Sequence, residues 1–224
     1  MIMTFSTEWE QLYKSNTHLS VWPWSDVVSL TNRYAKTIIQ NKGSVFELGC
    51  GAGANIPFFN ALGMEYFAID GSQTIIEQLH TRYPVLKNKI TCIDFKNCNF
   101  FNKNFDLIID RASLVHNNLD TIITVLDKSL KSLNEDGFFI AVDWFSTKHA
   151  DIQFADNIDD KYTYYNFKQG HLAGCGKVHF FDEEHLKEVF KDFEILLLEE
   201  KVIKQSLPNN GHQFAAWNIV AKKK

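Results

Sequence analysis

The sequence predicts an α/β fold in which helices cover both faces of a mostly parallel β-sheet. From residue 44 to residue 143, short apolar segments with strand character alternate with amphipathic segments of helical periodicity. A glycine-rich turn, residues 49–53, joins the first of these strands to the helix that follows it. Strict alternation of strands and helices implies right-handed crossover connections, and these produce a parallel sheet.

The first elements are helical. Thr7 and Glu10 have the spacing of a capping box, which predicts a short helix over residues 7–14. Ser25 is a favourable N-cap for a second helix with apolar residues on one face. We therefore expect an N-terminal helical part, residues 1–43, before the first strand of the sheet.

Strand-like and helix-like segments then alternate. The predicted strands are residues 44–48, 64–70, 89–95, 105–110 and 137–143, and the predicted helices are residues 55–62, 72–82 and 118–133. Ligands of parallel sheets bind beyond the carboxyl ends of the strands. The glycine-rich turn, Asp70, Asp94 and Asp110 all lie at such ends, so this edge of the sheet is the expected ligand site.

The last third of the sequence has a different pattern. A helix over residues 182–192 leads to strands 194–203 and 212–221, which the turn Pro208-Asn209-Asn210-Gly211 joins as an antiparallel hairpin. Residues 144–181 are too many for an ordinary connection. We expect them to form a cap over the ligand site; the alternative is a surface excursion that packs its own aromatic side chains.

Composition restricts the class of protein. With 224 residues, 45% of them hydrophobic, the chain fits one globular domain, residues 1–224, that carries a cap. The net charge of −4 gives no attraction for a polyanion, so no nucleic acid partner is expected. The four cysteines lack metal-ligand spacing, so no metal is expected. The absence of a signal peptide and of a membrane span predicts a cytoplasmic protein without a membrane partner.

The glycine-rich turn indicates a nucleotide-like cofactor. Gly49-x-Gly51-x-x-Ala54 satisfies a loose dinucleotide fingerprint, and Asp70 lies at the distance expected of a ribose-binding acid. Glu47, just before the turn, would repel a pyrophosphate but would suit an ammonium group. S-adenosyl-L-methionine carries an ammonium group, a carboxylate and ribose hydroxyls without any phosphate, so we favour it over NAD(P).

Five segments resemble, in order, the motifs of class I S-adenosylmethionine-dependent methyltransferases. They are Glu47-Leu48-Gly49-Cys50-Gly51-x-Gly53, Ile69-Asp70-Gly71-Ser72, Cys92-Ile93-Asp94-Phe95, Phe105-Asp106-Leu107-Ile108-Ile109-Asp110-Arg111 and Leu133-Asn134-Glu135-Asp136-Gly137-Phe138-Phe139-Ile140. The resemblance, to the small-molecule, stand-alone bacterial type, implies a Rossmann-like, seven-stranded, mostly parallel sheet with an antiparallel terminal strand. It also implies S-adenosyl-L-methionine as cofactor and S-adenosyl-L-homocysteine as product.

The resemblance implies roles for residues at the cofactor site. Glu47 would place the methionine ammonium, rather than being only a buried acid satisfied by N–H groups of the loop. Asp70 would accept hydrogen bonds from both ribose hydroxyls, because Ser72 can cap the following helix by itself. The full expected set is Glu47, Gly49, Cys50, Gly51, Gly53, Asn55, Asp70, Gly71, Ser72, Asp94, Phe95, Asp110 and Arg111.

Two pairs in this set have alternatives. Asp94 would accept from the adenine amino group while Phe95 packs on the ring, although Phe95 is equally suited to the core. Asp110 and Arg111 would line the methionine end of the cofactor, or their side chains would form a local ion pair of small energetic value.

The acceptor side is less defined. The candidate general bases are His116, His171 and His179. The candidate substrate contacts are Trp22, Trp24, Tyr162, Tyr164 and Tyr165. Each histidine also suits a structural role, and the two tryptophans suit packing of the N-terminal helix onto the sheet.

The expected reaction is methyl transfer to a hydroxyl or amine of a small molecule, such as a sugar or a biosynthetic intermediate. Such a transfer is an in-line displacement, for which the protein chiefly aligns the reactants and excludes water. Asp110-Arg111-Ala112-Ser113 lacks the Pro-Pro-aromatic run of enzymes that methylate base or amide nitrogens. An NAD(P)-dependent oxidoreductase and a non-catalytic S-adenosylmethionine-binding subunit are the alternatives, and we expect a monomer or homodimer.

Overall fold

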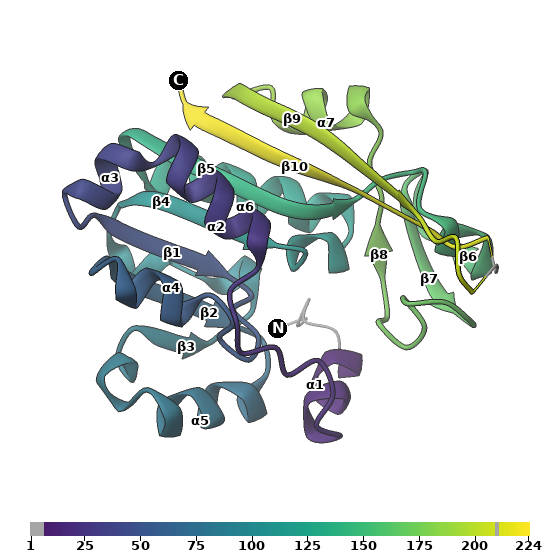
Figure 1. Ribbon diagram of the computed structural model, residues 1–224, viewed down its shortest axis with the longest axis horizontal. Helices are drawn as coiled ribbons and strands as arrows, with labels where there is room; N and C mark the ends of the chain where they lie inside the picture. Colours follow the sequence, from purple (N-terminus) through teal and green to yellow (C-terminus); the bar gives the residue numbers. More distant parts are fainter. Residues whose placement is uncertain (1–6, 209–210) are drawn as a thin grey trace.

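The computed structural model describes residues 7–208 and 211–224, and its main feature is a seven-stranded sheet (Figure 1). The strand order is β3-β2-β1-β4-β5-β10-β9. These strands are β1 (Ser44–Leu48), β2 (Glu65–Asp70), β3 (Ile90–Cys92), β4 (Phe105–Arg111), β5 (Leu133–Phe145), β9 (Phe193–Lys204) and β10 (Gln213–Lys223). The pairs from β3 to β5 are parallel, and β10 runs antiparallel to both β5 and β9. The predicted fold class is confirmed, including the antiparallel terminal strand.

Helices cover both faces of this sheet (Figure 1). The α-helices are α1 (Thr7–Lys14), α2 (Ser25–Tyr34), α3 (Lys36–Gln40), α4 (Ile56–Ala61), α5 (Gln73–Arg82), α6 (Leu119–Ser132) and α7 (Glu183–Val189). Because side chains alternate along a strand, Val45 of β1 packs in one core with residues of α2, α4 and α5. Phe46 packs on the other face, in a core with residues of α6 and α7.

The register brings the carboxyl ends of the central strands together. Leu48, the last residue of β1, pairs with Ile69 of β2 and with Asp110 of β4. The segments after these three strands therefore meet at one edge of the sheet, as is usual for parallel sheets.

Several element boundaries differ from the sequence prediction. The second helix is interrupted at Ala35, and its N-cap is Trp24 rather than Ser25, without a side-chain hydrogen bond. The strand predicted over residues 89–95 ends at Cys92, because the Asp94 carboxylate accepts from Lys96 N and starts a short 3₁₀ turn, η2 (Phe95–Asn97). The other 3₁₀ turns are η1 (Pro84–Leu86), η3 (Phe100–Asn102), η4 (Leu114–His116) and η5 (Ala150–Phe154).

Two further expectations concern single side chains. Glu10, expected in a capping box, instead accepts hydrogen bonds from the hydroxyls of Ser72 and Thr74, which joins α1 to α5. Asn209 and Asn210, the centre of the expected hairpin turn, lie outside the described residues. None of the described helices is long and apolar enough to cross a membrane.

Residues 144–181 contain a second, smaller sheet. After β5, the strands β6 (Ala155–Ile158), β7 (Thr163–Phe167) and β8 (Val178–His179) pair in the order β6-β7-β8. Their contacts with the main sheet are extensive: the Trp217 indole N–H donates to the Phe181 carbonyl at 3.0 Å. Phe180 and Phe181 are fully buried in the same core as α6 and β5. The segment is thus continuous with the main hydrophobic core.

Candidate active site

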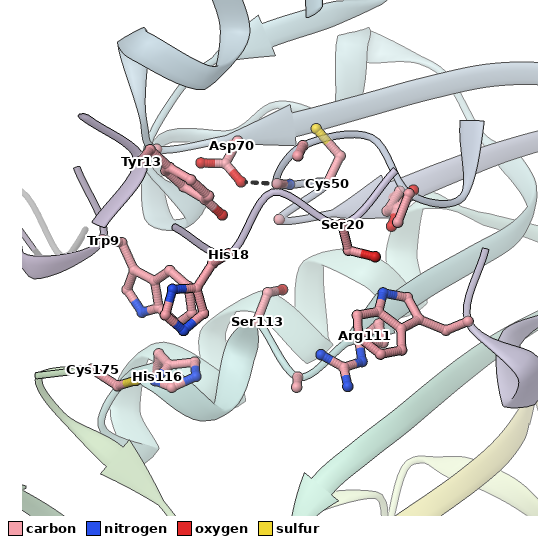
Figure 2. A pocket seen from close by; sticks show the side chains of 18 of the residues that line it. Trp9, Tyr13, His18, Ser20, Cys50, Asp70, Arg111, Ser113, His116 and Cys175 are labelled. Carbon is pink, nitrogen blue, oxygen red and sulfur yellow. Dashed lines mark hydrogen bonds between the residues drawn. The ribbon is translucent and has the colours of Figure 1, made fainter. Parts of the chain in front are cut away.

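A cavity of about 370 Å³ lies at the carboxyl edge of the main sheet (Figure 2). Its walls come from the segment that contains α1 and residues 18–24, the turn after β1, the ends of β2, β4 and β5, and the small-sheet segment. Phe214 of β10 completes the lining. Segments distant in the sequence therefore form one site.

The turn after β1 requires glycine for two reasons. Gly49 has φ of 64° and Gly51 has φ of 49°, a left-handed conformation that L side chains rarely adopt. A Cβ on Gly49 would lie 2.3 Å from Cβ of Ser113, so the chain segments could not approach as they do. The Gly51 N–H donates to Asp70 at 2.9 Å, which ties the turn to the end of β2 (Figure 2).

Glu47 is buried in the floor of the cavity. Its carboxylate accepts hydrogen bonds from Tyr66 OH and, at 2.8 Å, from Nδ2 of Asn55. Burial is the largest influence on this acid and raises its pKa to about 7. Glu47 therefore titrates near neutral pH at a position that lines the cavity.

Asp70 holds the two loops that flank the cavity. Its Oδ2 accepts from Gly51 N and its Oδ1 from Ser72 N, both at 2.9 Å. Ser72 caps α5 as expected, since its hydroxyl accepts from Ile75 N at 3.2 Å. Asp70 also contacts this helix terminus, because it accepts from the Ser72 backbone N–H. An ionised carboxylate has about four lone pairs, so it can still accept from a ligand. Burial raises the pKa of Asp70 to about 6.

Asp94 and Asp110 are buried and are not among the residues that line the cavity. The Asp94 carboxylate caps η2, and only its neighbour Phe95 lines the cavity. The Asp110 carboxylate accepts from Ser113 OH, from Leu114 N at 3.1 Å and from the Trp144 indole at 2.6 Å. These two acids shape the loops that line the site.

Arg111 is the one permanent cation among the described residues that line the cavity. Its Nη2 lies 2.8 Å from Asp143, and its guanidinium carbon lies 3.6 Å from the centroid of the Trp24 ring. Among the described contacts, Arg111 pairs with Asp143 and Asp110 accepts from Trp144, so the two do not form the ion pair considered above. Adjacent residues of a strand point to opposite faces of the sheet.

The three candidate histidines have different surroundings. His116 lines the cavity, packs edge-on against Trp9 at 4.8 Å, and has its Nδ1 3.3 Å from the Lys177 carbonyl. Burial lowers the pKa of His116 to about 4. His171 also lines the cavity. His179 does not: it is fully buried between Thr163 and His185.

The cap tyrosines and Trp22 lie outside the cavity. Tyr162 stacks on His185 at 4.1 Å, and Tyr164 packs against Phe180. Tyr165 and Trp22 are 37% and 75% exposed. The three tyrosines contact α7, the core of the small sheet or solvent, so the geometry does not support a substrate role for them. Trp24, in contrast, lines the cavity.

Sequence reasoning missed several residues that line the cavity. Trp9 and Tyr13 are four residues apart on α1 and therefore share a face, a signal available in the sequence. Phe145, His149 and Phe214 become neighbours only through the tertiary fold, and nothing in their spacing indicates it.

The site has no metal-binding chemistry. Among the residues that the structure describes, no group of His, Cys, Asp or Glu side chains could hold a metal ion. Cys50 and Cys175 line the cavity, but burial raises the pKa of each thiol, to about 11 for Cys175. Both therefore remain protonated at neutral pH.

The sequence matches the family described as "Methyltransferase domain" over residues 14–198. No curated protein matches the sequence. Among solved structures, TehB from Haemophilus influenzae is similar at 21% identity, with 96% of this chain and 67% of that chain covered and a TM-score of 0.62. An S-adenosylmethionine-dependent methyltransferase from Anabaena variabilis ATCC 29413 is similar at 16% identity, with 97% and 93% covered and a TM-score of 0.67.

A third similar structure has a small-molecule name. It is the 1,6-didemethyltoxoflavin-N1-methyltransferase of Burkholderia thailandensis, with bound 1,6-didemethyltoxoflavin and S-adenosylhomocysteine. The identity is 18%, the alignment covers 97% of this chain and 86% of that chain, and the TM-score is 0.62. At these identities, the three structures show that the fold is shared.

Proposed function

We propose that this chain, which belongs to the methyltransferase-domain family and is a class I S-adenosylmethionine-dependent methyltransferase, transfers the methyl group to a small molecule. The enzyme class and the cofactor follow from the family, and they set aside the oxidoreductase and the non-catalytic subunit as alternatives. The acceptor and the role of each residue are the subject of the proposal.

The residues around the glycine-rich turn fit S-adenosyl-L-methionine. Gly49 and Gly51 leave no Cβ in the turn, so backbone can approach a ligand closely. The acids that line the cavity beside the turn are Glu47 and Asp70, which suit an ammonium group and ribose hydroxyls. Arg82 donates to the Ala52 carbonyl of the turn at 3.1 Å but does not line the cavity. When bound, this cofactor supplies a methyl group on a positively charged sulfur, which is an excellent leaving group.

We assign the cofactor contacts as follows. Asp70 accepts from the ribose hydroxyls with the lone pairs that Gly51 and Ser72 leave available. Glu47 faces the ammonium group, Phe95 packs on the adenine ring, and Arg111 binds the methionine carboxylate.

On the acceptor side, His116 is the favoured general base. It lines the cavity, and its low pKa keeps the imidazole neutral at pH 7 and able to take a proton. Two backbone groups contact the ring: the Lys177 carbonyl lies 3.3 Å from Nδ1 and can only accept, and the Cys175 backbone also hydrogen-bonds to the imidazole. To act as the base, His116 must carry its proton on Nδ1 and offer the Nε2 lone pair to the acceptor substrate. His171 is the second candidate base.

One observation supports a small-molecule acceptor. The residues assigned to the cofactor around the glycine-rich turn, here called the cofactor cradle (Glu47, Gly49, Gly51 and Asp70), line the same cavity as the small-sheet segment. With about 370 Å³, it falls within the range of roughly 300–1,000 Å³ that is usual for small-ligand sites. The N-terminal segment and residues 144–181 thus act together as a cap. The similar Burkholderia enzyme, whose name specifies a small molecule, supports the same acceptor class.

Calorimetry and a transfer assay test this proposal. S-adenosylhomocysteine should bind in the micromolar range, while NADH and NADPH should not bind. With methyl-tritiated S-adenosylmethionine and a cell extract as acceptor source, a new labelled compound, separated from S-adenosylmethionine by chromatography, should appear among the small metabolites, and only when the enzyme is added. Label retained only with protein or nucleic acid would refute the small-molecule acceptor.

A further inference from the structure

Helix α1 places one tyrosine against the glycine-rich turn. Tyr13 lines the cavity and is only 7% exposed, because its ring packs in the core that also contains Cys50 and Leu79. A Cβ on Gly51 would lie 3.0 Å from the Tyr13 hydroxyl oxygen, so this oxygen is close to the turn that the cofactor approaches. The Glu10 carboxylate, on the same helix, holds α1 against α5. The Tyr13 hydroxyl therefore has a defined position at the cofactor site.

This hydroxyl forms no hydrogen bond with any of the described residues. It differs from polar atoms that are sealed in the interior without a partner, such as Nε1 of Trp9, because the Tyr13 hydroxyl oxygen keeps solvent-accessible surface. Figure 2 shows the Tyr13 side chain at the cavity, with its hydroxyl beside the carboxylate of Asp70. A ligand in the cavity can therefore reach this oxygen without a rearrangement of the protein.

The protonation state of Tyr13 makes it a donor. Burial raises the pKa of the phenol well above its usual range, and the nearby carboxylate of Asp70 raises it further. The hydroxyl therefore keeps its proton throughout the neutral pH range. Most buried polar groups in native structures are paired, so an accepting atom of a ligand is the expected partner of this donor.

Asp70 provides a complementary acceptor in the same part of the cavity. Its Oδ2 accepts from Gly51 N and its Oδ1 from Ser72 N, both at 2.9 Å, and each oxygen has a further lone pair. A ligand hydroxyl can accept from Tyr13 and donate to Asp70 at the same time. A ligand carboxylate would be repelled by Asp70, and a ligand ammonium could not accept from Tyr13. The pair of side chains therefore indicates a hydroxyl.

We propose that Tyr13 donates a hydrogen bond to the same ribose hydroxyl of the cofactor that donates to Asp70. This inference rests on the proposed function, in which Asp70 binds the ribose, and it adds a contact from a helix outside the sheet. Tyr13 makes α1 part of the cofactor site and selects a ribose against a deoxyribose. It is a specificity residue for the cofactor, and the methyl transfer itself requires no proton from it.

Calorimetry with S-adenosylhomocysteine at pH 8, where Asp70 is ionised, tests the contact. In Tyr13→Phe the affinity should fall about 3- to 10-fold, the effect of one lost hydrogen bond, while the ring and its packing remain. Tyr164→Phe is the matched control, because Tyr164 is a half-buried tyrosine of the small sheet that lies outside the cavity. This control should bind as the wild type does. Unchanged affinity in Tyr13→Phe overturns the proposal.

Cofactor analogues identify the atom that Tyr13 contacts. The analogue 5′-methylthioadenosine keeps the ribose and lacks the amino-acid part, so Tyr13→Phe should weaken its binding as much as that of S-adenosylhomocysteine. With 2′-deoxy- and 3′-deoxy-S-adenosylhomocysteine, the effect of the variant should disappear for the analogue that lacks the contacted hydroxyl. A loss absent with 5′-methylthioadenosine would assign Tyr13 to the methionine part, and a loss that persists with both deoxy analogues would exclude the ribose hydroxyls. Either result overturns the proposal.

Thermal unfolding separates this role from a structural one. Without ligand, Tyr13→Phe should unfold at the wild-type temperature, and the same concentration of S-adenosylhomocysteine should stabilise it less than the wild type. A lower unfolding temperature without ligand, combined with an equal ligand-induced increase, would assign the hydroxyl to the fold and overturn the proposal. If the wild type does not bind S-adenosylhomocysteine at all, the proposed function fails first. If it binds, and Asp70→Asn weakens binding while Tyr13→Phe does not, only this inference fails.

Discussion

Single residues in the cofactor cradle combine unusual backbone geometry with buried charge. Gly51 has a positive φ, and its N–H is used by Asp70. The two cavity-lining acids, Glu47 and Asp70, have pKa values raised by burial to about 7 and about 6. Both features arise from packing a polar ligand site at the end of a buried sheet, and both can be measured.

Gly51→Val should reduce the affinity for S-adenosylhomocysteine at least tenfold. The new Cβ would lie 3.0 Å from Tyr13 OH, in the turn that the cofactor approaches, and a side chain at this φ costs about 1–2 kcal/mol. Gly174→Val is the matched control, because Gly174 also has a positive φ but no heavy atom within 4 Å of its Cβ position. Calorimetry should show a loss in the first variant alone; equal affinities would place the cofactor elsewhere.

Cofactor affinity should fall in acid. Asp70 binds hydroxyls best as a carboxylate, so its protonation below a pKa of about 6 should weaken S-adenosylhomocysteine binding about tenfold at pH 5 relative to pH 8. Asp70→Asn should bind more weakly at pH 8 and should lack the step near pH 6. Glu47→Gln should keep that step and lose any step near pH 7. An unchanged pH profile in Asp70→Asn would exclude Asp70 as the ribose acid.

At the scale of elements, α1 and the small sheet each contact a neighbouring helix through identifiable polar side chains. The Glu10 carboxylate joins α1 to α5 through the hydroxyls of Ser72 and Thr74. Helix α1 also provides Trp9 and Tyr13 to the cavity lining. The small sheet meets α7 at a pair of imidazoles, the buried His179 and the half-buried His185. Each junction allows a test confined to one element.

Glu10→Ala should release α1 and accelerate dissociation of S-adenosylhomocysteine about 3- to 10-fold, the range expected for one or two charge-assisted hydrogen bonds at a partly exposed side chain. Gln11→Ala, at an exposed position on the same helix, serves as the control and should leave the rate unchanged. Stopped-flow displacement measures both rates. If the Glu10→Ala rate equals the wild-type rate, α1 does not retain the cofactor.

The imidazole pair should weaken the fold in acid. Burial lowers the pKa of His179 to about 3 and also lowers that of His185, so the unfolded chain binds protons more readily than the folded one. The contribution of the imidazole pair to the unfolding free energy is therefore complete above about pH 6.5 and is lost as the pH falls toward 3. The raised pKa values of Glu47, Asp70 and Asp110 act in the opposite sense, so the comparison must be between variants.

Urea unfolding from pH 4 to pH 7 measures this contribution. The difference in unfolding free energy between the wild type and His179→Gln should shrink as the pH falls. Thr81→Ala, which removes an exposed hydroxyl and no titratable group, should show a constant difference. A constant difference for His179→Gln as well would mean that the imidazole pair does not respond to pH.

The elements also show what the sequence could predict. Strands β1, β2 and β4 and the cradle residues Glu47, Gly51 and Asp70 were predictable, because each signal is local: an apolar run, a glycine turn and an acid at a strand end. The early end of β3 has a local cause, since the Asp94 carboxylate accepts from Lys96 N, but an acid at a strand end was interpreted as a ligand contact instead. The contributions of Phe145, His149 and Phe214 to the cavity were unpredictable, because these residues become neighbours only through the tertiary fold.

At the scale of the whole molecule, the two sheets share one hydrophobic core. Phe167, Val178 and Phe180 of the small-sheet segment are buried in the same cluster as Phe105 of β4 and Ile122 of α6. Removing the cap would therefore remove part of the core that supports the cofactor site. We expect the two sheets to lose their structure together.

Thermal unfolding should consequently show one transition. Tryptophan fluorescence and far-ultraviolet circular dichroism should give coincident curves. Saturation with S-adenosylhomocysteine at 100 times its Kd should stabilise the protein by about 2.7 kcal/mol. Limited proteolysis that cuts within residues 155–177 well below the transition would show that the small sheet opens independently.

The position of β10 between β5 and β9 has a consequence for biosynthesis. Ribosomes deliver β5 and β9 first, yet β9 pairs with β10, and β10 also contributes Phe214 to the cavity. A nascent chain that ends before residue 213 exposes the unpaired edge of β5 and leaves the twelve residues of β9 without a sheet. Chains that end before β10 should therefore be inactive and prone to aggregation, because β10, the last strand of this sheet in chain order, completes both the sheet and the cavity.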